Sequence, residues 1–219
     1  MKATSGLVLA VLVALFLWFG WTGGAGNGFD VDAIIRLAAW RHAHPQVTSA
    51  AIVLTGIGNA TVTVTVPLLA GALLWAKWRR GAAVMLVATV LLERAVADSI
   101  KFAYDRARPA FDLHPVMTNS SSYPSGHAAN ATTAFVALAL FAAPPAMRRP
   151  AVALAIVGGL LIGLTRPFLG VHWPSDVIGG WTLATIFLLS ARAIDHRWSI
   201  AHEAQHDVVG RHLPPFGED

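Results

Sequence analysis

Long apolar stretches alternate along this chain with short polar segments that hold most of its charges. Six stretches are long enough to cross about 30 Å of hydrocarbon as helices. They are residues 6–21, 50–75, 82–97, 128–143, 151–165 and 177–191. The pattern predicts an all-α, polytopic membrane protein built as a bundle of six transmembrane helices over residues 1–198, with a polar tail at 199–219.

The first apolar stretch also has features of a signal peptide. Lys2 precedes it and small residues 22–26 follow it. Its apolar core is long, however, and Trp18 and Trp21 lie where an interfacial aromatic belt would be. We therefore expect this helix to be retained.

A short amphipathic helix is predicted between the first two spans. Asp30 precedes residues 31–41, whose apolar positions recur at near-helical spacing. A helix of this kind lies on the membrane surface with its apolar face in the lipid.

Composition narrows the class of protein further. The chain is 55% hydrophobic and 13% charged, whereas soluble domains are about 25% charged. The net charge of +4, with no basic block, argues against a nucleic-acid-binding protein. The chain has no Cys, which excludes a disulfide, a thiolate metal site and a Cys nucleophile.

Basic residues in the short loops predict the orientation. With six spans, one face of the membrane receives Lys2, Lys77, Arg79, Arg80, Arg148, Arg149, Arg192 and Arg197. That face is expected to be the cytoplasm, so both termini are cytoplasmic and loops 22–49, 98–127 and 166–176 face outside.

Cations on the outer face run against this trend. They are Lys101, Arg106, Arg108 and Arg166. An anionic ligand on that face would explain them, although long loops also cross the membrane regardless of their charge.

The outer loops hold three polar motifs. The first runs from Lys101 to Arg108 and Pro109. Lys101 offers a compact positive charge, and Arg108 offers a planar guanidinium suited to phosphate oxygens. The second is Tyr123-Pro-Ser-Gly-His127, which alone is typical of a turn before a helix. Beside the first, its Ser125 and Gly126 become candidate phosphate donors, and His127 a group that can carry a proton.

The third motif extends from Arg166 to Asp176. Pro174 is well placed in the first turn of the sixth span, and His172 and Asp176 are four residues apart across its start. The carboxylate is thus expected to hold and polarise the imidazole. Phosphoryl transfer requires such a cluster of cations, a nucleophile and an acid.

Other polar groups remain open to more than one interpretation. Glu93, Arg94 and Asp98 lie in or near the third span, where they form either an internal pair that supports the outer site or a purely structural pair. The histidines outside the motifs have no evident third ligand nearby, so no metal site is predicted from His42, His44, His202, His206 or His212.

Together, Lys-x6-Arg-Pro at 101–109, Pro-Ser-Gly-His at 124–127 and Arg-x5-His-x3-Asp at 166–176 resemble the three signatures of the type 2 phosphatidic acid phosphatase superfamily. The family often has Ser before the third-motif Arg, where this chain has Thr165 and keeps a hydroxyl. The resemblance implies that His172 attacks phosphorus, that Asp176 orients it, and that His127 protonates the leaving oxygen and then activates water. It implies phosphate binding by Lys101, Arg108, Ser125, Gly126 and Arg166, and no metal or other cofactor.

The resemblance also implies a membrane lipid phosphate as substrate and a plasma (inner) membrane of bacterial type as location. Polyprenyl diphosphate is favoured, because the short six-helix form resembles bacterial enzymes of that kind, while phosphatidylglycerophosphate, phosphatidic acid and lipid A phosphates remain possible. Two alternatives are a vanadium-dependent haloperoxidase, which the apolar spans disfavour, and a non-catalytic lipid-phosphate binding or transport protein, which would not explain two His and an Asp at these spacings.

Overall fold

A computed structural model of the 219-residue chain describes residues 3–111, 115–116 and 120–212, with side chains described from 5 to 198 within those ranges. The described residues form α-helices and one short 3₁₀ helix, and no strand occurs among them. The helices are α1 (Ala3–Thr22), α2 (Gly28–Ala43), α3 (Pro45–Ile57), α4 (Ala60–Ala76), α5 (Arg80–Tyr104), α6 (Gly126–Phe141), η1 (Pro145–Met147), α7 (Arg148–Phe168) and α8 (Pro174–His212).

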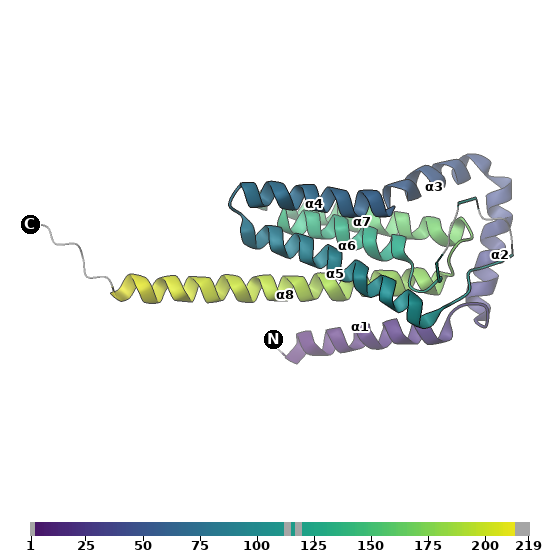
Figure 1. The fold of residues 1–219 in the computed structure, drawn as a ribbon. Coiled ribbons are helices and arrows are strands. Elements are labelled where there is room, and N and C mark those ends of the chain that lie inside the picture. The colour runs from purple at the N-terminus through teal and green to yellow at the C-terminus, as the bar shows by residue number, and fades with distance from the viewer. Residues whose placement is uncertain (1–2, 112–114, 117–119, 213–219) are drawn as a thin grey trace, which may run out of the picture.

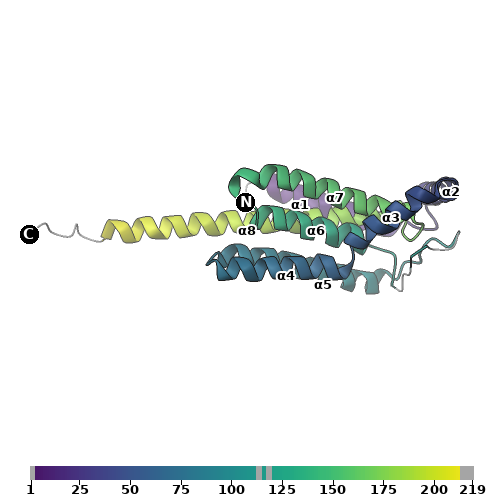
Figure 2. The ribbon, with the colours of Figure 1, turned by 90° about the horizontal axis from the view of Figure 1, so that it is seen from above.

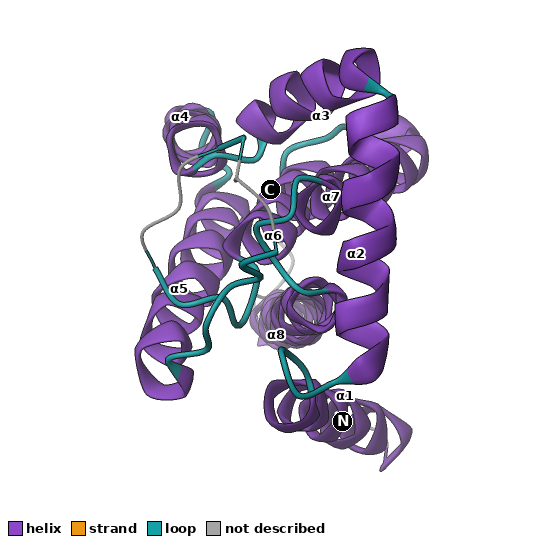
Figure 3. Ribbon diagram, turned by 90° about the vertical axis from the view of Figure 1, so that its right-hand side faces the viewer, coloured by secondary structure: helices purple, strands orange, loops and turns teal. Residues whose placement is uncertain are grey.

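The long helices lie along a common direction, and α2 crosses one end of the bundle (Figures 1 and 3). Helix α1 begins toward the other end of the bundle, and α8 projects beyond that end (Figure 1). Helix α6 is central, since it contacts α4, α5, α7 and α8 (Figure 2). Its many Ala and Thr residues are small and buried, which lets the neighbouring helices approach closely.

The outer surface of the bundle is apolar. Many large hydrophobic side chains are exposed on it, such as Leu7, Val53 and Leu154, and an apolar surface of this extent needs lipid around it. Within the described residues, four stretches are long and apolar enough to cross a membrane: Ser5–Thr22, Pro45–Ala76, Pro145–Phe168 and Pro174–Trp198. The chain is therefore a multi-pass membrane protein. Helix α6 is apolar but shorter, and α5 carries Glu93 and Arg94, so the count of six spans stays a prediction.

The stretch 50–75, predicted as one span, is not one helix. Helix α3 ends at Ile57 and α4 begins at Ala60. Asn59 caps α4, because its side chain accepts a hydrogen bond from Val62 N at 3.0 Å. Gly58 lies at this break and packs closely against α7 and His127. An added Cβ there would lie 2.5 Å from Ile162 Cγ2 and 3.2 Å from His127 Cδ2.

The amphipathic helix predicted at 31–41 is present as α2, which begins three residues earlier and crosses the bundle end. Asn27 caps it by accepting from Asp30 N at 3.1 Å. Arg41 ties it to α7 by donating from Nη1 to Phe168 O at 2.9 Å. The tail predicted at 199–219 is helical as far as His212, as a continuation of α8; the side chains of its His202, His206 and His212 lie outside the described residues.

Candidate active site

The three predicted motifs meet at the end of the bundle that α2 crosses (Figure 3). Lys101 lies in the last turn of α5. Asp105 ends this helix in a left-handed conformation, with φ 43° and ψ 40°, which Asp adopts more readily than most residues. The chain then turns back, so that Arg106 N donates to Ser121 Oγ at 2.8 Å and Arg106 O accepts from Ser122 N at 2.8 Å.

The second motif leads into α6 and lies against α8. A Cβ on Gly179 would overlap the ring of Tyr123, and one on Gly180 would lie 2.7 Å from Ser125 O. Ser125 N also donates to Asp176 O at 3.0 Å. Two adjacent glycines of α8 therefore let the motif approach that helix closely.

The third motif spans the connection from α7 to α8. Arg166 lies in the last turn of α7, where it is almost fully buried and donates from Nη1 to Thr55 Oγ1 of α3 at 2.7 Å. Gly170 has φ +75°, and a Cβ there would lie 2.9 Å from Arg41 Nη1. Helix α8 begins at Pro174, as predicted, so His172 lies just before it.

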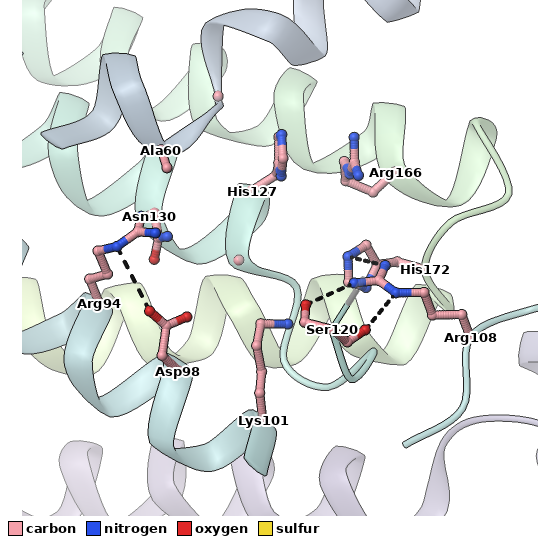
Figure 4. Close-up of a pocket in the computed structure, with 12 residues that line it drawn as sticks. Ala60, Arg94, Asp98, Lys101, Arg108, Ser120, His127, Asn130, Arg166 and His172 are labelled. Atoms are coloured by element: carbon pink, nitrogen blue, oxygen red, sulfur yellow. Dashed lines mark hydrogen bonds and ion pairs between the residues drawn. The ribbon is translucent and has the colours of Figure 1, made fainter. Parts of the chain in front are cut away.

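These segments enclose a cavity of about 230 Å³. Six of the eight predicted site residues line it: Lys101, Arg108, Gly126, His127, Arg166 and His172. The remaining lining residues are Gly58, Ala60, Arg94, Asp98, Ser120 and Asn130 (Figure 4). We call these twelve residues the cavity wall.

The contacts of His172 determine where its proton lies. Arg108 Nη1 is 3.0 Å from His172 Nε2, and a guanidinium can only donate. Nε2 is therefore the acceptor, and the proton of the neutral ring is on Nδ1, which lies 3.4 Å from Asp176 Oδ2. Complete burial, and next the charge of Arg108, hold the pKa of His172 well below its ordinary value of 6.5. The result is a neutral imidazole with a lone pair on the nitrogen that faces Arg108.

Backbone carbonyls hold two cations of the cavity wall, Lys101 and Arg108, in place. Lys101 Nζ donates to Ser121 O at 3.0 Å and to Pro124 O at 2.6 Å. Arg108 donates from Nε to Ser120 O at 2.8 Å and from Nη1 to Val171 O at 2.6 Å. Burial lowers the pKa of Arg108, which a guanidinium can tolerate and remain charged. These neutral acceptors leave the positive charges available to an anion.

His127 lies between the two ends of the cavity (Figure 4). Within the described part of the chain its ring makes no hydrogen bond, and it packs beside Gly58 at the α3–α4 break. The ring is thus placed to exchange a proton with a group that enters the cavity.

Two predicted site residues are fully buried and do not line the cavity: Ser125 and Asp176. Asp176 lies behind His172, where its Oδ2 accepts hydrogen bonds from Trp173 N at 2.9 Å and from Ser122 Oγ. The Ser125 hydroxyl has no hydrogen-bond partner among the described residues.

A layer of polar contacts behind His172 was not predicted. Arg106 Nη1 donates to Asp176 Oδ1 at 2.8 Å and to Ser175 Oγ at 3.2 Å, while Nη2 donates to Phe19 O at 2.8 Å and to Gly20 O. Its guanidinium also lies 4.5 Å from the centre of the Tyr123 ring. We call Arg106, Asp176, Ser175, Asp30 and Tyr123 the buried layer.

The buried layer joins the site to the first two helices. Asp30 is fully buried and accepts from Ser175 N at 3.0 Å, from Ser175 Oγ at 2.5 Å and from Gly24 N at 2.7 Å. Tyr123 Oη donates to Phe16 O of α1. The sequence held one signal of this layer, since Arg106 was among the unexplained outer cations. The position of Asp30, far from the three motifs in the sequence, gave no indication that it belongs to this layer.

No metal site was predicted, and the described residues include no group of three or more His, Asp, Glu or Cys side chains that could hold a metal ion. Two acidic side chains near the cavity are in ion pairs. Asp176 pairs with Arg106, and Asp98 lies 3.8 Å from Arg94.

Comparison with known proteins gives several matches. Residues 82–199 match the PAP2 superfamily. Phosphatidylglycerophosphatase B of Bacillus subtilis is 26% identical over 194 residues, which cover 84% of this chain and 95% of that protein. Undecaprenyl-diphosphatase of Sulfolobus acidocaldarius is 29% identical over 186 residues, or 82% of this chain and 85% of that protein. Lipid A 1-phosphatase of Rhizobium johnstonii is 36% identical over 110 residues, which cover 46% of this chain and 43% of that protein.

The fold also matches a solved structure. The crystal structure of a transmembrane PAP2-type phosphatidylglycerophosphate phosphatase from Bacillus subtilis aligns with a TM-score of 0.78 at 22% identity, over 86% of this chain and 96% of that one. At this identity the similarity establishes the fold alone.

Proposed function

The chain belongs to the PAP2 superfamily, and on that premise we propose that it is a membrane lipid phosphatase that acts through a phosphohistidine intermediate. The relatives named above are phosphatases of membrane lipids. The single observation that carries the proposal is the state of His172. Its Nε2 lone pair faces Arg108, and its proton is on Nδ1, toward Asp176.

In the first step the lone pair of His172 Nε2 attacks phosphorus. The bond from phosphorus to the leaving oxygen breaks, and that oxygen takes a proton from His127. Burial and the charges of Arg166, Arg108 and Lys101 lower the pKa of His127 to about 3. The negative charge of the bound phosphate offsets these cations and raises this pKa, so that the ring takes up its proton together with the substrate. Lys101, Arg108 and Arg166 hold the phosphoryl oxygens and stabilise the charge that develops on them. Asp176 stabilises the Nδ1–H side of the ring as Nε2 becomes bonded to phosphorus.

In the second step His127, now neutral, accepts a proton from a water molecule. The water oxygen attacks phosphorus on the side that the leaving group vacated, and the phosphorus–nitrogen bond breaks. Inorganic phosphate leaves, and His172 regains its lone pair. Gly126 lines the cavity at the start of α6, where the helix dipole favours an anion, and belongs to this proposal as a donor. Ser125 belongs to it only through its hydroxyl, which is buried beside Gly126 and has no partner among the described residues, because its N–H donates to Asp176 O.

The proposed substrate is a lipid whose phosphate or diphosphate lies at the outer membrane surface. Six spans, cytoplasmic termini and an outward-facing site in a plasma membrane form part of the proposal. The α4–α5 turn carries Lys77 and Arg79, and Arg148 and Arg149 begin α7. Both lie at the bundle end opposite α2 (Figure 1), which supports this orientation. Polyprenyl diphosphate is the favoured substrate, with phosphatidylglycerophosphate and phosphatidic acid next.

The test is phosphate release by the purified protein from a panel of lipid phosphates and diphosphates in detergent micelles. Wild type should release phosphate from at least one lipid, with or without a chelator, and His172→Gln should lose at least a thousandfold in kcat while remaining folded. Full turnover by His172→Gln would show that the proposed nucleophile is wrong. Turnover that a chelator abolishes and a divalent cation restores would show that the reaction needs a metal.

A further inference from the structure

The cavity extends beyond the three phosphate-binding motifs. Arg108, Ser120, Arg166 and His172 form one end of it, and Arg94, Asp98, Asn130 and Ala60 form the other, with His127 between them (Figure 4). None of the residues at the second end belongs to the three motifs. We call this second end the Arg94 end.

The proposed reaction directs the leaving group toward the Arg94 end. Phosphoryl transfer places the attacking and leaving atoms roughly in line on opposite sides of phosphorus. With His172 as the attacking group, the leaving oxygen points away from it, toward the proton on His127. A leaving group therefore continues past His127 to the Arg94 end.

Arg94 is held in place at this end by fixed contacts. With the Asn130 amide oriented so that both of its groups are satisfied, its oxygen accepts from Arg94 Nη1 at 3.1 Å and its nitrogen donates to Glu93 Oε2 at 3.1 Å. Glu93 is fully buried. The ion pair of Arg94 with Asp98 is long, at 3.8 Å, and the Asp98 side chain is 57% exposed. The guanidinium therefore has a firm support on one side and a weak, exposed partner on the other.

Charge balance favours a leaving group that is itself anionic. The cavity wall contains four permanent or near-permanent cations, Arg94, Lys101, Arg108 and Arg166, and one carboxylate, Asp98. A lipid alcohol leaving group would bring no charge to Arg94, and an arginine within a membrane helix is costly unless it serves an anion or a cavity. A lipid phosphate leaving group would bring that anion.

We propose that Arg94, supported by Asn130, binds the lipid-linked phosphate of a diphosphate substrate, so that the site favours lipid diphosphates over monophosphates. This inference rests on the proposed function. The bond that breaks joins the terminal phosphorus to the bridging oxygen. That oxygen leaves with the lipid monophosphate and takes its proton from His127, while the terminal phosphoryl group passes to His172.

The experiment compares farnesyl diphosphate with farnesyl monophosphate, which differ only in the second phosphate. Arg94→Gln should lower the ratio of their kcat/KM values, diphosphate to monophosphate, by roughly ten- to hundredfold, as expected for a lost hydrogen-bonded charge pair. Asp98→Asn should raise the same ratio, because it removes the carboxylate that competes for Arg94. If the role of Arg94 were merely structural, Arg94→Gln would lower kcat/KM for both substrates by the same factor and leave the ratio unchanged.

The matched control is Arg149→Gln, an exposed arginine at the start of α7, which should leave both values as in wild type. An unchanged ratio in Arg94→Gln would overturn the inference and leave the proposed function standing. If wild type hydrolyses neither farnesyl substrate nor any lipid of the panel, the proposed function fails and the inference fails with it.

Discussion

The cavity wall and the buried layer behind His172 are both rich in charge, but they are built differently. In the wall, Lys101 and Arg108 donate mainly to neutral backbone carbonyls. In the buried layer, Arg106 is paired directly with Asp176, and Asp30 accepts three hydrogen bonds from Ser175 and Gly24.

This difference separates two tasks. A cation held by neutral carbonyls keeps its charge available for a phosphate, while a carboxylate that accepts hydrogen bonds on both oxygens is fixed in one geometry. His172 lies at the boundary, with Arg108 on one nitrogen and Asp176 near the other. Changes in the wall should therefore alter activity alone, whereas changes in the buried layer should alter stability as well.

After His172→Gln, the largest effect is expected from His127→Gln in the cavity wall. Loss of a general acid and base costs about two to four orders of magnitude in kcat. The stability of the fold should not change, because the ring makes no hydrogen bond within the described residues. Steady-state phosphate release from a lipid phosphate, together with thermal unfolding in detergent, measures both quantities. With p-nitrophenyl phosphate, whose leaving group needs no proton, the first step should be much less affected. An equal loss in the rate of the first step for both substrates would argue against His127 as the acid, whereas the second step is common to both and should slow equally.

Arg106→Gln should have the next largest effect and should reduce stability. It leaves the buried Asp176 carboxylate without its cation, which costs about 3–5 kcal/mol for a buried pair. We expect a lower unfolding temperature and a lower kcat with little change in KM, since Arg106 does not line the cavity. Arg106→Lys should recover part of the loss. Wild-type stability in Arg106→Gln would mean that the two regions do not differ as described.

Two glycines provide a matched pair. A Cβ on Gly126 would meet Lys101 Cε at 3.7 Å and the Asn130 amide group at 3.8 Å, which are ordinary contacts, but it would project where the wall meets a ligand. Gly126→Ala should lower kcat/KM by about tenfold with no loss of stability. Gly180→Ala, whose Cβ would lie 2.7 Å from Ser125 O, should destabilise the protein by about 1–3 kcal/mol.

Melting temperatures and kcat/KM values of the two alanine variants check this pair. If Gly126→Ala is the less stable of the two, then Gly126 serves packing rather than phosphate binding.

The smallest effect concerns pH. Because the pKa of His172 lies well below 6.5, its ring should remain neutral as pH falls through 6.5. Arg108→Gln removes a positive charge that lowers this pKa, so the ring should take up its proton at a higher pH than in wild type. Histidine ¹⁵N NMR, with the His172 signal assigned by its loss in His172→Gln, follows this titration. A wild-type ring that titrates at or above 6.5 contradicts the buried, cation-flanked site.

The sequence predicted the cavity wall far better than the buried layer. The spacing within the motifs predicted Lys101, Arg108, His127 and His172 as site residues, because each motif is short and lies beside a helix end. The contact of Asp30 with Ser175 joins residues 145 positions apart, and no periodicity reports such a contact. The break at Gly58 was also missed, since hydropathy alone is nearly continuous across it and the evidence is a cap at Asn59.

The central claim is that His172 becomes covalently phosphorylated. Wild type should be mixed with a ³²P-labelled lipid phosphate, quenched within the first turnover in alkaline denaturant, and analysed for protein-bound label. We predict label that is stable in alkali, labile in acid, located on the peptide that contains His172, and absent from His172→Gln. Turnover without any protein-bound label, or label that persists in His172→Gln, would contradict the account.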